Sequence, residues 1–172
     1  MSDILEWLKG GDLRSIGRSE EVVNAVLNNT DLFDDVIIGM THDNPVIRMR
    51  ASDAVEKITK DHPQLLAAHK DMILNKVSTS EQKEVRWHVA QILPRLDLTD
   101  DEVQTAVGIL RGYLDDDSRI VRTFSMEALV GFIERQPEMA LWVLNLVEDM
   151  IEDGSPAMKS RGKKLLARLR KE

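Results

Sequence analysis

The feature that most constrains the fold of this sequence is a short pattern that occurs four times at nearly constant spacing. In each copy an apolar residue precedes a cation, a small or β-branched residue follows three positions later, and a large aliphatic residue follows seven positions later. The central cations, 38, 36 and 37 residues apart, are Arg48, Arg86, Arg122 and Lys159. A fixed period of this size predicts stacked helix pairs, because each pair buries its apolar face only against its neighbours.

Helix start and stop signals divide the chain into an N-terminal cap and four helix pairs. Pro45 follows Asn44 as a helix start, Thr99 and Glu102 form a capping-box pattern, and Pro94 predicts a kink or an early helix end. No segment alternates with period two, so we predict an all-α chain with no sheet. The predicted parts of this single domain are the cap, 1–30, and the repeats, 31–60, 61–98, 99–136 and 137–172.

The cap lacks the repeated cation, and its helices are predicted from local signals alone. We expect a short helix from Asp3 to Lys9, closed by Gly10-Gly11, and another helical turn from Asp12 to Arg18. Ser19 precedes two glutamates, which predicts an N-cap and a helix that runs to about Asn28. End units of this kind cover the exposed face of a repeat array.

The turn before each second helix resembles that of the HEAT-repeat family. The first pair carries Asp43-Asn44-Pro45 before Val46-Ile47-Arg48, with the small residue Ala51 three positions after the cation. The resemblance covers roughly residues 31–170 and implies an α-solenoid of about four antiparallel helix pairs. The chain is similar to the small single-domain HEAT-repeat proteins of prokaryotes, most of which have no assigned activity. HEAT repeats serve many unrelated roles, so the resemblance does not specify a function. The last copy departs from the pattern, with Lys159 in place of arginine.

The repeated cations have an acidic residue five positions earlier in the first three copies. The resemblance implies a ladder of acid–arginine pairs that links one repeat to the next, and arginine suits this role because its guanidinium donates to several acceptors at once. Ligand-binding arginines are the alternative. The predicted ladder consists of Asp43, Arg48, Glu81, Arg86, Asp117, Arg122 and Lys159.

A second set of residues, two, five and nine positions after each cation, lies on one face of each second helix. The apolar residues Ile47, Val85 and Val121 lie on the opposite side, so we expect this set, called here the polar row, to face solvent. Second helices commonly line the concave, partner-binding surface of solenoids. The predicted partner-binding residues of the polar row are Arg50, Asp53, Lys57, His88, Gln91, Arg95, Phe124, Glu127, Arg161 and Lys164.

Three tryptophans accompany these helices. Trp87 follows Arg86 directly and has two interpretations, packing between neighbouring second helices or stacking on a ligand, of which we favour the first. Trp7 and Trp142 are predicted to pack in the cap and the core.

Catalytic, metal and cofactor sites are not predicted. The chain has no cysteine, and its four histidines form no H-E-x-x-H pattern. Asp115-Asp116-Asp117 lacks the glycine and the distal glutamate of a calcium-binding loop. The N-terminus shows no signal peptide and no apolar run is long enough to span a bilayer, so a cytoplasmic setting is predicted.

Charge is unevenly distributed along the chain. Residues 155–172 carry seven Lys or Arg and one acid, a balance of +6, so the remainder of this chain of net charge −7 carries −13. An acidic body repels nucleic acid, whereas a basic end attracts acidic partners. We therefore expect a non-catalytic scaffold that binds another protein or peptide, with no membrane partner and no evident small-molecule substrate. The alternatives are a HEAT-like nucleic-acid-binding or DNA-repair protein and, by fold analogy alone, an enzyme accessory protein.

Overall fold

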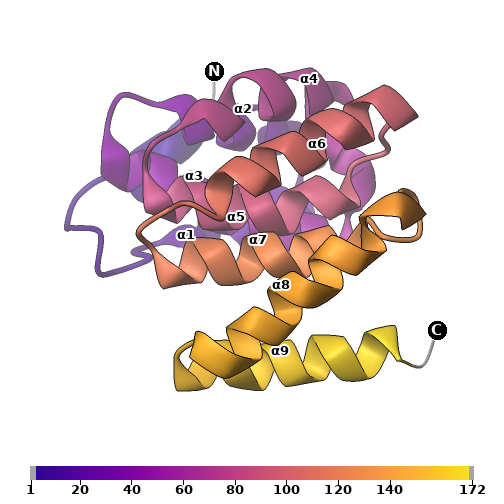
Figure 1. The fold of residues 1–172 in the computed structure, drawn as a ribbon. Helices are drawn as coiled ribbons and strands as arrows, with labels where there is room; N and C mark the ends of the chain where they lie inside the picture. The colour runs from indigo at the N-terminus through magenta and orange to yellow at the C-terminus, as the bar shows by residue number, and fades with distance from the viewer. Residues whose placement is uncertain (1–2, 171–172) are drawn as a thin grey trace. The chain divides into compact units, whose positions relative to one another are not determined.

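The computed structural model describes residues 3–170, so the outermost ends of the cap and of the last predicted repeat, including the basic residue Lys171, lie outside it. All regular secondary structure within residues 3–170 is helical, which confirms the all-α prediction (Figure 1). None of these helices is both long enough and apolar enough to cross a lipid bilayer. The chain divides between Asp97 and Leu98 into two compact units, one residue from the expected junction of the second and third repeats.

Unit 1, which ends at Asp97, is organised around its longest helix, α3 (Pro45–Asp61), which packs against α1, α2 and α5. Ile47 and Val55 on the apolar face of α3 and Val85 on α5 are fully buried, as the repeat predicts. The other α-helices are α1 (Ser19–Asn28), α2 (Phe33–Ile38), α4 (Lys70–Asn75) and α5 (Lys83–Ile92). The 3₁₀ segments are η1 (Asp3–Leu8), η2 (Thr30–Leu32), η3 (Gly39–Thr41), η4 (Pro63–His69), η5 (Val77–Thr79) and η6 (Leu93–Arg95).

Two of the predicted boundaries in unit 1 are confirmed. The Asn44 side chain accepts a hydrogen bond from the Val46 N–H at 2.9 Å, so the first turn of α3 is capped where Pro45 places it. Helix α5 ends at Ile92 and continues as a 3₁₀ turn through Pro94, because proline has no N–H to donate within the helix.

Two expectations for the first half of unit 1 are wrong. Residues 12–18 form a loop rather than a helical turn, because Asp12 binds the backbone N–H and guanidinium of Arg14, and Gly17 adopts a φ of +55°. Ser19 is the first residue of α1 and not its cap, since its hydroxyl bonds to Asp53 and to the Arg50 carbonyl of α3 instead. The first helix of each pair here is also split into short α and 3₁₀ pieces.

Unit 2, which begins at Leu98, contains longer and more regular helices. Thr99 and Glu102 form the predicted capping box at the start of α6 (Asp100–Tyr113). The remaining elements are α7 (Arg119–Gly131), η7 (Pro137–Met139), α8 (Ala140–Asp153) and α9 (Pro156–Leu169). Helices α8 and α9 form a close hairpin, seen in orange and yellow in Figure 1. A Cβ on Gly162 would lie 2.8 Å from the Ile151 Cγ1 atom, so only glycine permits this approach without a shift.

Candidate binding surface

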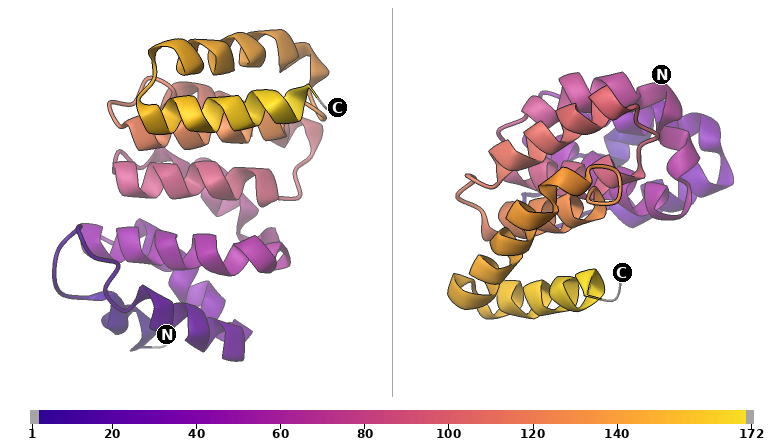
Figure 2. Two further views of the ribbon diagram at one scale, coloured as in Figure 1. Left: turned by 90° about the horizontal axis from the view of Figure 1, so that it is seen from below. Right: turned by 45° about the vertical axis from the view of Figure 1, so that its right-hand side comes forward.

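The polar row of unit 1 lies on α3 and α5, two helices that run side by side in Figure 2. Asp53, Lys57, Gln91 and Arg95 are half-buried rather than freely exposed. They do not stand alone in solvent, because neighbouring helices supply partners for most of their polar groups.

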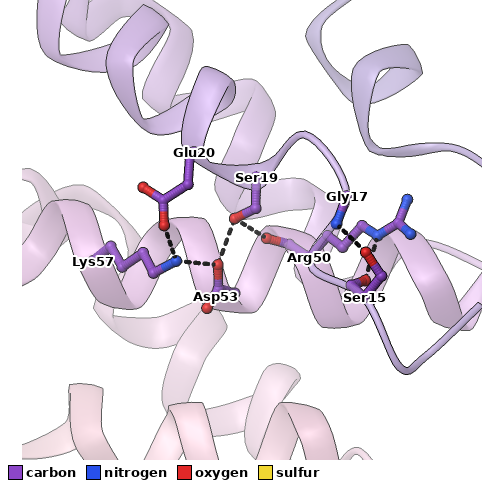
Figure 3. Close-up of polar contacts among 7 residues, drawn as sticks. All are labelled: Ser15, Gly17, Ser19, Glu20, Arg50, Asp53 and Lys57. Atoms are coloured by element: carbon purple, nitrogen blue, oxygen red, sulfur yellow. Dashed lines mark hydrogen bonds and ion pairs between the residues drawn. The ribbon is translucent and has the colours of Figure 1, made fainter.

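One group of contacts joins α3 to α1 (Figure 3). The Ser19 hydroxyl donates to Asp53 Oδ2 at 2.5 Å, and Lys57 Nζ lies 2.9 Å from the same oxygen. Lys57 also pairs with Glu20 at the start of α1. Burial opposes the charge of the ammonium group, but its hydrogen bonds to Glu20 and Asp53 outweigh this and raise the pKa of Lys57. The result is a charged cluster held in one geometry.

A second group of contacts joins α3 to α5. Arg95 donates to the carboxylate of Glu56, to the Glu56 carbonyl at 2.5 Å and to the Thr59 hydroxyl at 3.1 Å. The side chains of Arg95 and Glu56 are only 20 % and 15 % exposed, so their pairing is shielded from solvent more than that of an ordinary surface pair.

Arg95→Met is expected to lower the free energy of unfolding by about 2 kcal/mol, because it leaves the Glu56 carboxylate and two further acceptors without their donor. Adding Glu56→Gln to this variant should cost less than the same change in the native chain, since the charge it removes is then unpaired. Urea denaturation of the two single variants and the double variant measures the coupling. Costs that add to within about 0.3 kcal/mol would contradict a coupled pair.

His88, on α5, contradicts the expectation that the polar row faces solvent. It is 8 % exposed, and its Nδ1 atom is buried without a hydrogen-bond partner among the described residues. Burial lowers the pKa of His88 to about 4; the carboxylates of Asp53 and Glu56 act in the opposite direction, and the charges of Lys57 and Arg95 reinforce the shift. A neutral imidazole therefore lies within a cluster of charges.

Arg50, on α3, also contradicts that expectation, because it is 3 % exposed. Its guanidinium donates to three backbone carbonyls of the N-terminal segment, Leu8 at 2.8 Å, Ser15 at 3.0 Å and Lys9 at 3.2 Å. Figure 3 shows this side chain extending to the loop that carries Ser15 and Gly17. The repeat assigns Arg50 to a helix face but does not reveal that the irregular loop 9–18 covers it.

The polar row of unit 2 lies on α7 and α9. Arg161 Nη1 is 2.9 and 2.7 Å from the two carboxylate oxygens of Glu127, and its guanidinium carbon is 5.8 Å from the centroid of the Phe124 ring. Glu127 is half-buried, and its carboxylate is already paired with Arg161. Lys164 is exposed. Phe124 serves in part as a support for the arginine, through a cation–π contact.

Three of the four repeated cations bind the chain just before their own helices, but through backbone carbonyls. Arg48 donates to the carbonyls of His42 and Asp43, and Arg86 to that of Ser80. Lys159 donates to the Glu152 carbonyl in the same way. The predicted ladder assigns a carboxylate to three of these cations, namely those of Asp43, Glu81 and Asp117. None of these three carboxylates forms an ion pair within residues 3–170.

The link between the first two pairs is instead made by an amide side chain. Arg48 Nε donates to Gln82 Oε1 at 2.9 Å, and Gln82 Nε2 donates to the Pro45 carbonyl at 2.9 Å. Arg122 differs from the other cations, because its Nε atom is buried with no hydrogen-bond partner among the described residues.

The tryptophans occupy three different settings. Trp87 is half-buried, with its ring centroid 5.6 Å from that of His88 in an edge-on arrangement, which leaves both of its interpretations open. Trp7 is 37 % exposed beneath Arg18, and Trp142 is half-buried beneath Arg111.

The structure adds neighbours of the polar row that the sequence reasoning missed, namely Ser19, Glu20 and Glu56. A usable signal was present, because the charged partners are separated by about one repeat: Glu20 and Lys57 by 37 residues, Glu56 and Arg95 by 39. Glu127 and Arg161 are separated by 34. Within residues 3–170, no three His, Cys, Asp or Glu side chains converge as metal ligands would.

The chain was compared with models of protein families, with curated proteins and with solved structures, and none of the three comparisons found a match. Similarity therefore assigns no family here, and a functional assignment depends on the geometry described above.

Proposed function

We propose that this chain is a non-catalytic protein-interaction module made of HEAT-like repeats, and that it binds an acidic or mixed-charge protein partner through the polar row and helix α9. The observation that carries the proposal is the charge of α9. This helix contains no acidic residue and exposes Lys163 and Lys164, although the whole chain has a net charge of −7. A concentrated basic surface on an acidic protein favours encounter with acidic partners.

The solenoid part of the proposal is supported by local features shared by several helices. The residues before α3, α7 and α9, namely Asn44, Ser118 and Ser155, each cap the following helix with a side-chain oxygen. Arg48 and Arg86 both bind carbonyls of the preceding turn. Four copies of one helix-pair repeat, aligned at the repeated cation, are the simplest source of these shared features. The proposal also includes a cytoplasmic setting, which rests on the sequence alone.

The partner contacts in this proposal come from the polar-row side chains that reach solvent. Arg50 and His88 are buried, so no direct contact is assigned to them. The half-buried members are already held by Ser19, Glu20, Glu56 and Glu127, so a partner meets a surface that needs little ordering. Preorganisation of this kind lowers the entropic cost of binding.

The test is capture of partners from a native lysate on the immobilised chain, followed by quantitative mass spectrometry. The variant Lys163→Glu/Lys164→Glu should recover the specific partner at least five-fold less well than the native chain. Lys60→Glu/Lys76→Glu changes the net charge equally at two other exposed positions and should recover it normally. Recovery should also fall with added salt, because exposed charges are screened within about 8 Å at physiological ionic strength. Equal losses in both variants would contradict a role for α9.

The basic face of α9 also favours nucleic acid as a second candidate. Fluorescence anisotropy with labelled duplex DNA separates the two functions. We expect dissociation constants no tighter than about 10⁻⁶ M at physiological salt, the non-specific range. A salt-resistant, submicromolar complex that is lost in Lys163→Glu/Lys164→Glu would replace the protein-binding proposal with the nucleic-acid one.

A further inference from the structure

Unit 2 contains a cavity of about 380 Å³ between the start of α7 and the end of α8. Its lining includes three methionines, Met126, Met150 and Met158, of which the first two are buried. Thioether side chains adapt their shape to a guest and form a polarizable apolar surface. The volume lies within the range of about 300–1,000 Å³ that is typical of small-molecule sites.

Two arginines border this cavity, and neither forms an ion pair among the described residues. Arg119 is the first residue of α7, and Arg122 lies three residues further along. Both are near the positive end of the helix dipole, where cations are disfavoured. The buried Nε atom of Arg122 has no acceptor. By contrast, the equivalent cations Arg48, Arg86 and Lys159 all donate to carbonyls.

Two aspartates border the cavity from α8 and are likewise without an ion pair among the described residues. Asp153 is the last residue of α8, and Asp149 stands one turn earlier, so both lie near the negative end of that helix dipole. Around this one cavity, two cations thus lie near the positive end of a helix dipole and two anions near the negative end of another. None of the four forms an ion pair among the described residues. Local arrangements that cost stability in this way are concentrated at functional sites.

We propose that this cavity binds a free α-amino acid with an apolar side chain. The carboxylate of the ligand pairs with the guanidinium groups of Arg119 and Arg122, beside the N-terminus of α7. The ammonium group lies against Asp149 and Asp153, at the C-terminus of α8. The apolar side chain rests on the methionines. Each unfavourable charge then gains an opposite one, and the arrangement does not depend on the protein-binding function proposed above.

The experiment uses the full chain labelled with ¹³C at the methionine methyl groups and titrated with L-leucine, L-isoleucine and L-phenylalanine. At least one of these should move the resonances of Met126, Met150 and Met158 in a saturable way. Met40 and Met49, in unit 1, are internal controls whose resonances should stay in place. For the amino acid that binds, the N-acetyl derivative lacks the ammonium group and the amide lacks the carboxylate, and each should bind at least ten-fold more weakly.

Variants assign the two charges. Arg122→Gln and Asp149→Asn should each weaken binding at least ten-fold, whereas Glu148→Gln, on an exposed neighbouring position of α8, should leave it unchanged. Asp149 is itself exposed, so its variant is expected to fold normally even if that of Arg122 does not, and circular dichroism checks this. The proposal is overturned if none of the three amino acids shifts the cavity methionines, if either derivative binds as tightly as its parent, or if Asp149→Asn binds normally.

Discussion

Arg50→Met is expected to lower the free energy of unfolding of unit 1 by about 3 kcal/mol, because hydrogen bonds to a charged donor contribute roughly 1.5–3 kcal/mol each when they are buried. The guanidinium serves the carbonyls of Leu8, Lys9 and Ser15, and no other side chain replaces it there. Methionine keeps the apolar stem of the side chain, so the loss reports on the hydrogen bonds more than on packing.

Urea denaturation measures this effect, and limited trypsin digestion supplies a second readout, because cleavage at Arg18, which both the variant and its control below retain, should accelerate once the loop is released. The matched control is Arg14→Met, whose side chain is 90 % exposed and which should change stability by less than about 0.5 kcal/mol. Equal stability of the two variants would show that Arg50 does not hold the loop.

A change in the loop itself should act in the same direction. Gly17 has a φ of +55°, and a Cβ there would lie 2.5 Å from the Arg50 Cζ atom. Gly17→Val therefore both strains the backbone and displaces the guanidinium. The two substitutions together should cost less than the sum of their separate effects, because each removes the same contacts.

The parts of the fold that the sequence predicts correctly are those determined by local chemistry. The cap at Asn44, the capping box at Thr99 and the helix end before Pro94 involve groups a few residues apart, and all three are present. Ile47, Val85 and Val121 share one position of the repeat, and all are fully buried.

The errors occur where the surroundings of a residue come from outside the repeat. Arg50 is buried by a loop that has no periodic counterpart, and Ser19 bonds to α3 rather than to its own helix. Position on a helix face follows from period, but the segment that covers this face does not. The carbonyl partners of Arg48 and Arg86 were missed for a related reason, since every residue carries a carbonyl and sequence gives no sign of which one faces a cation.

Acid is expected to destabilise this chain through His88. The pKa of this residue is lowered to about 4 in the folded chain from an ordinary value of 6.5, a difference of about 2.5, and each unit corresponds to about 1.4 kcal/mol. Between these two values the unfolded chain binds the proton and the folded chain does not. The contribution of His88 is therefore fully present above pH 6.5, and about 3 kcal/mol is lost as the pH falls towards 4.

The groups that face the imidazole make this prediction specific. Asp53 and Glu56 attract a proton to His88, but they are already engaged by Lys57 and Arg95, whose charges repel it. The effect of burial therefore dominates. The buried Nδ1 atom has no hydrogen-bond partner among the described residues, so no acceptor there stabilises the protonated imidazole.

The test is the pH dependence of the free energy of unfolding between pH 6.5 and 4 for the native chain and for His88→Gln. The variant should lose most of the His88 contribution to this dependence, whatever its stability at pH 7, because glutamine does not titrate. His62→Gln, at a half-buried position near the start of η4, is the control for the removal of a histidine outside this cluster. An NMR titration should show one histidine with a midpoint near 4 that disappears in His88→Gln. Parallel stability curves for the native chain and His88→Gln would mean that the imidazole is hydrated in solution, and that the charges around it belong to an open surface rather than to a closed cluster.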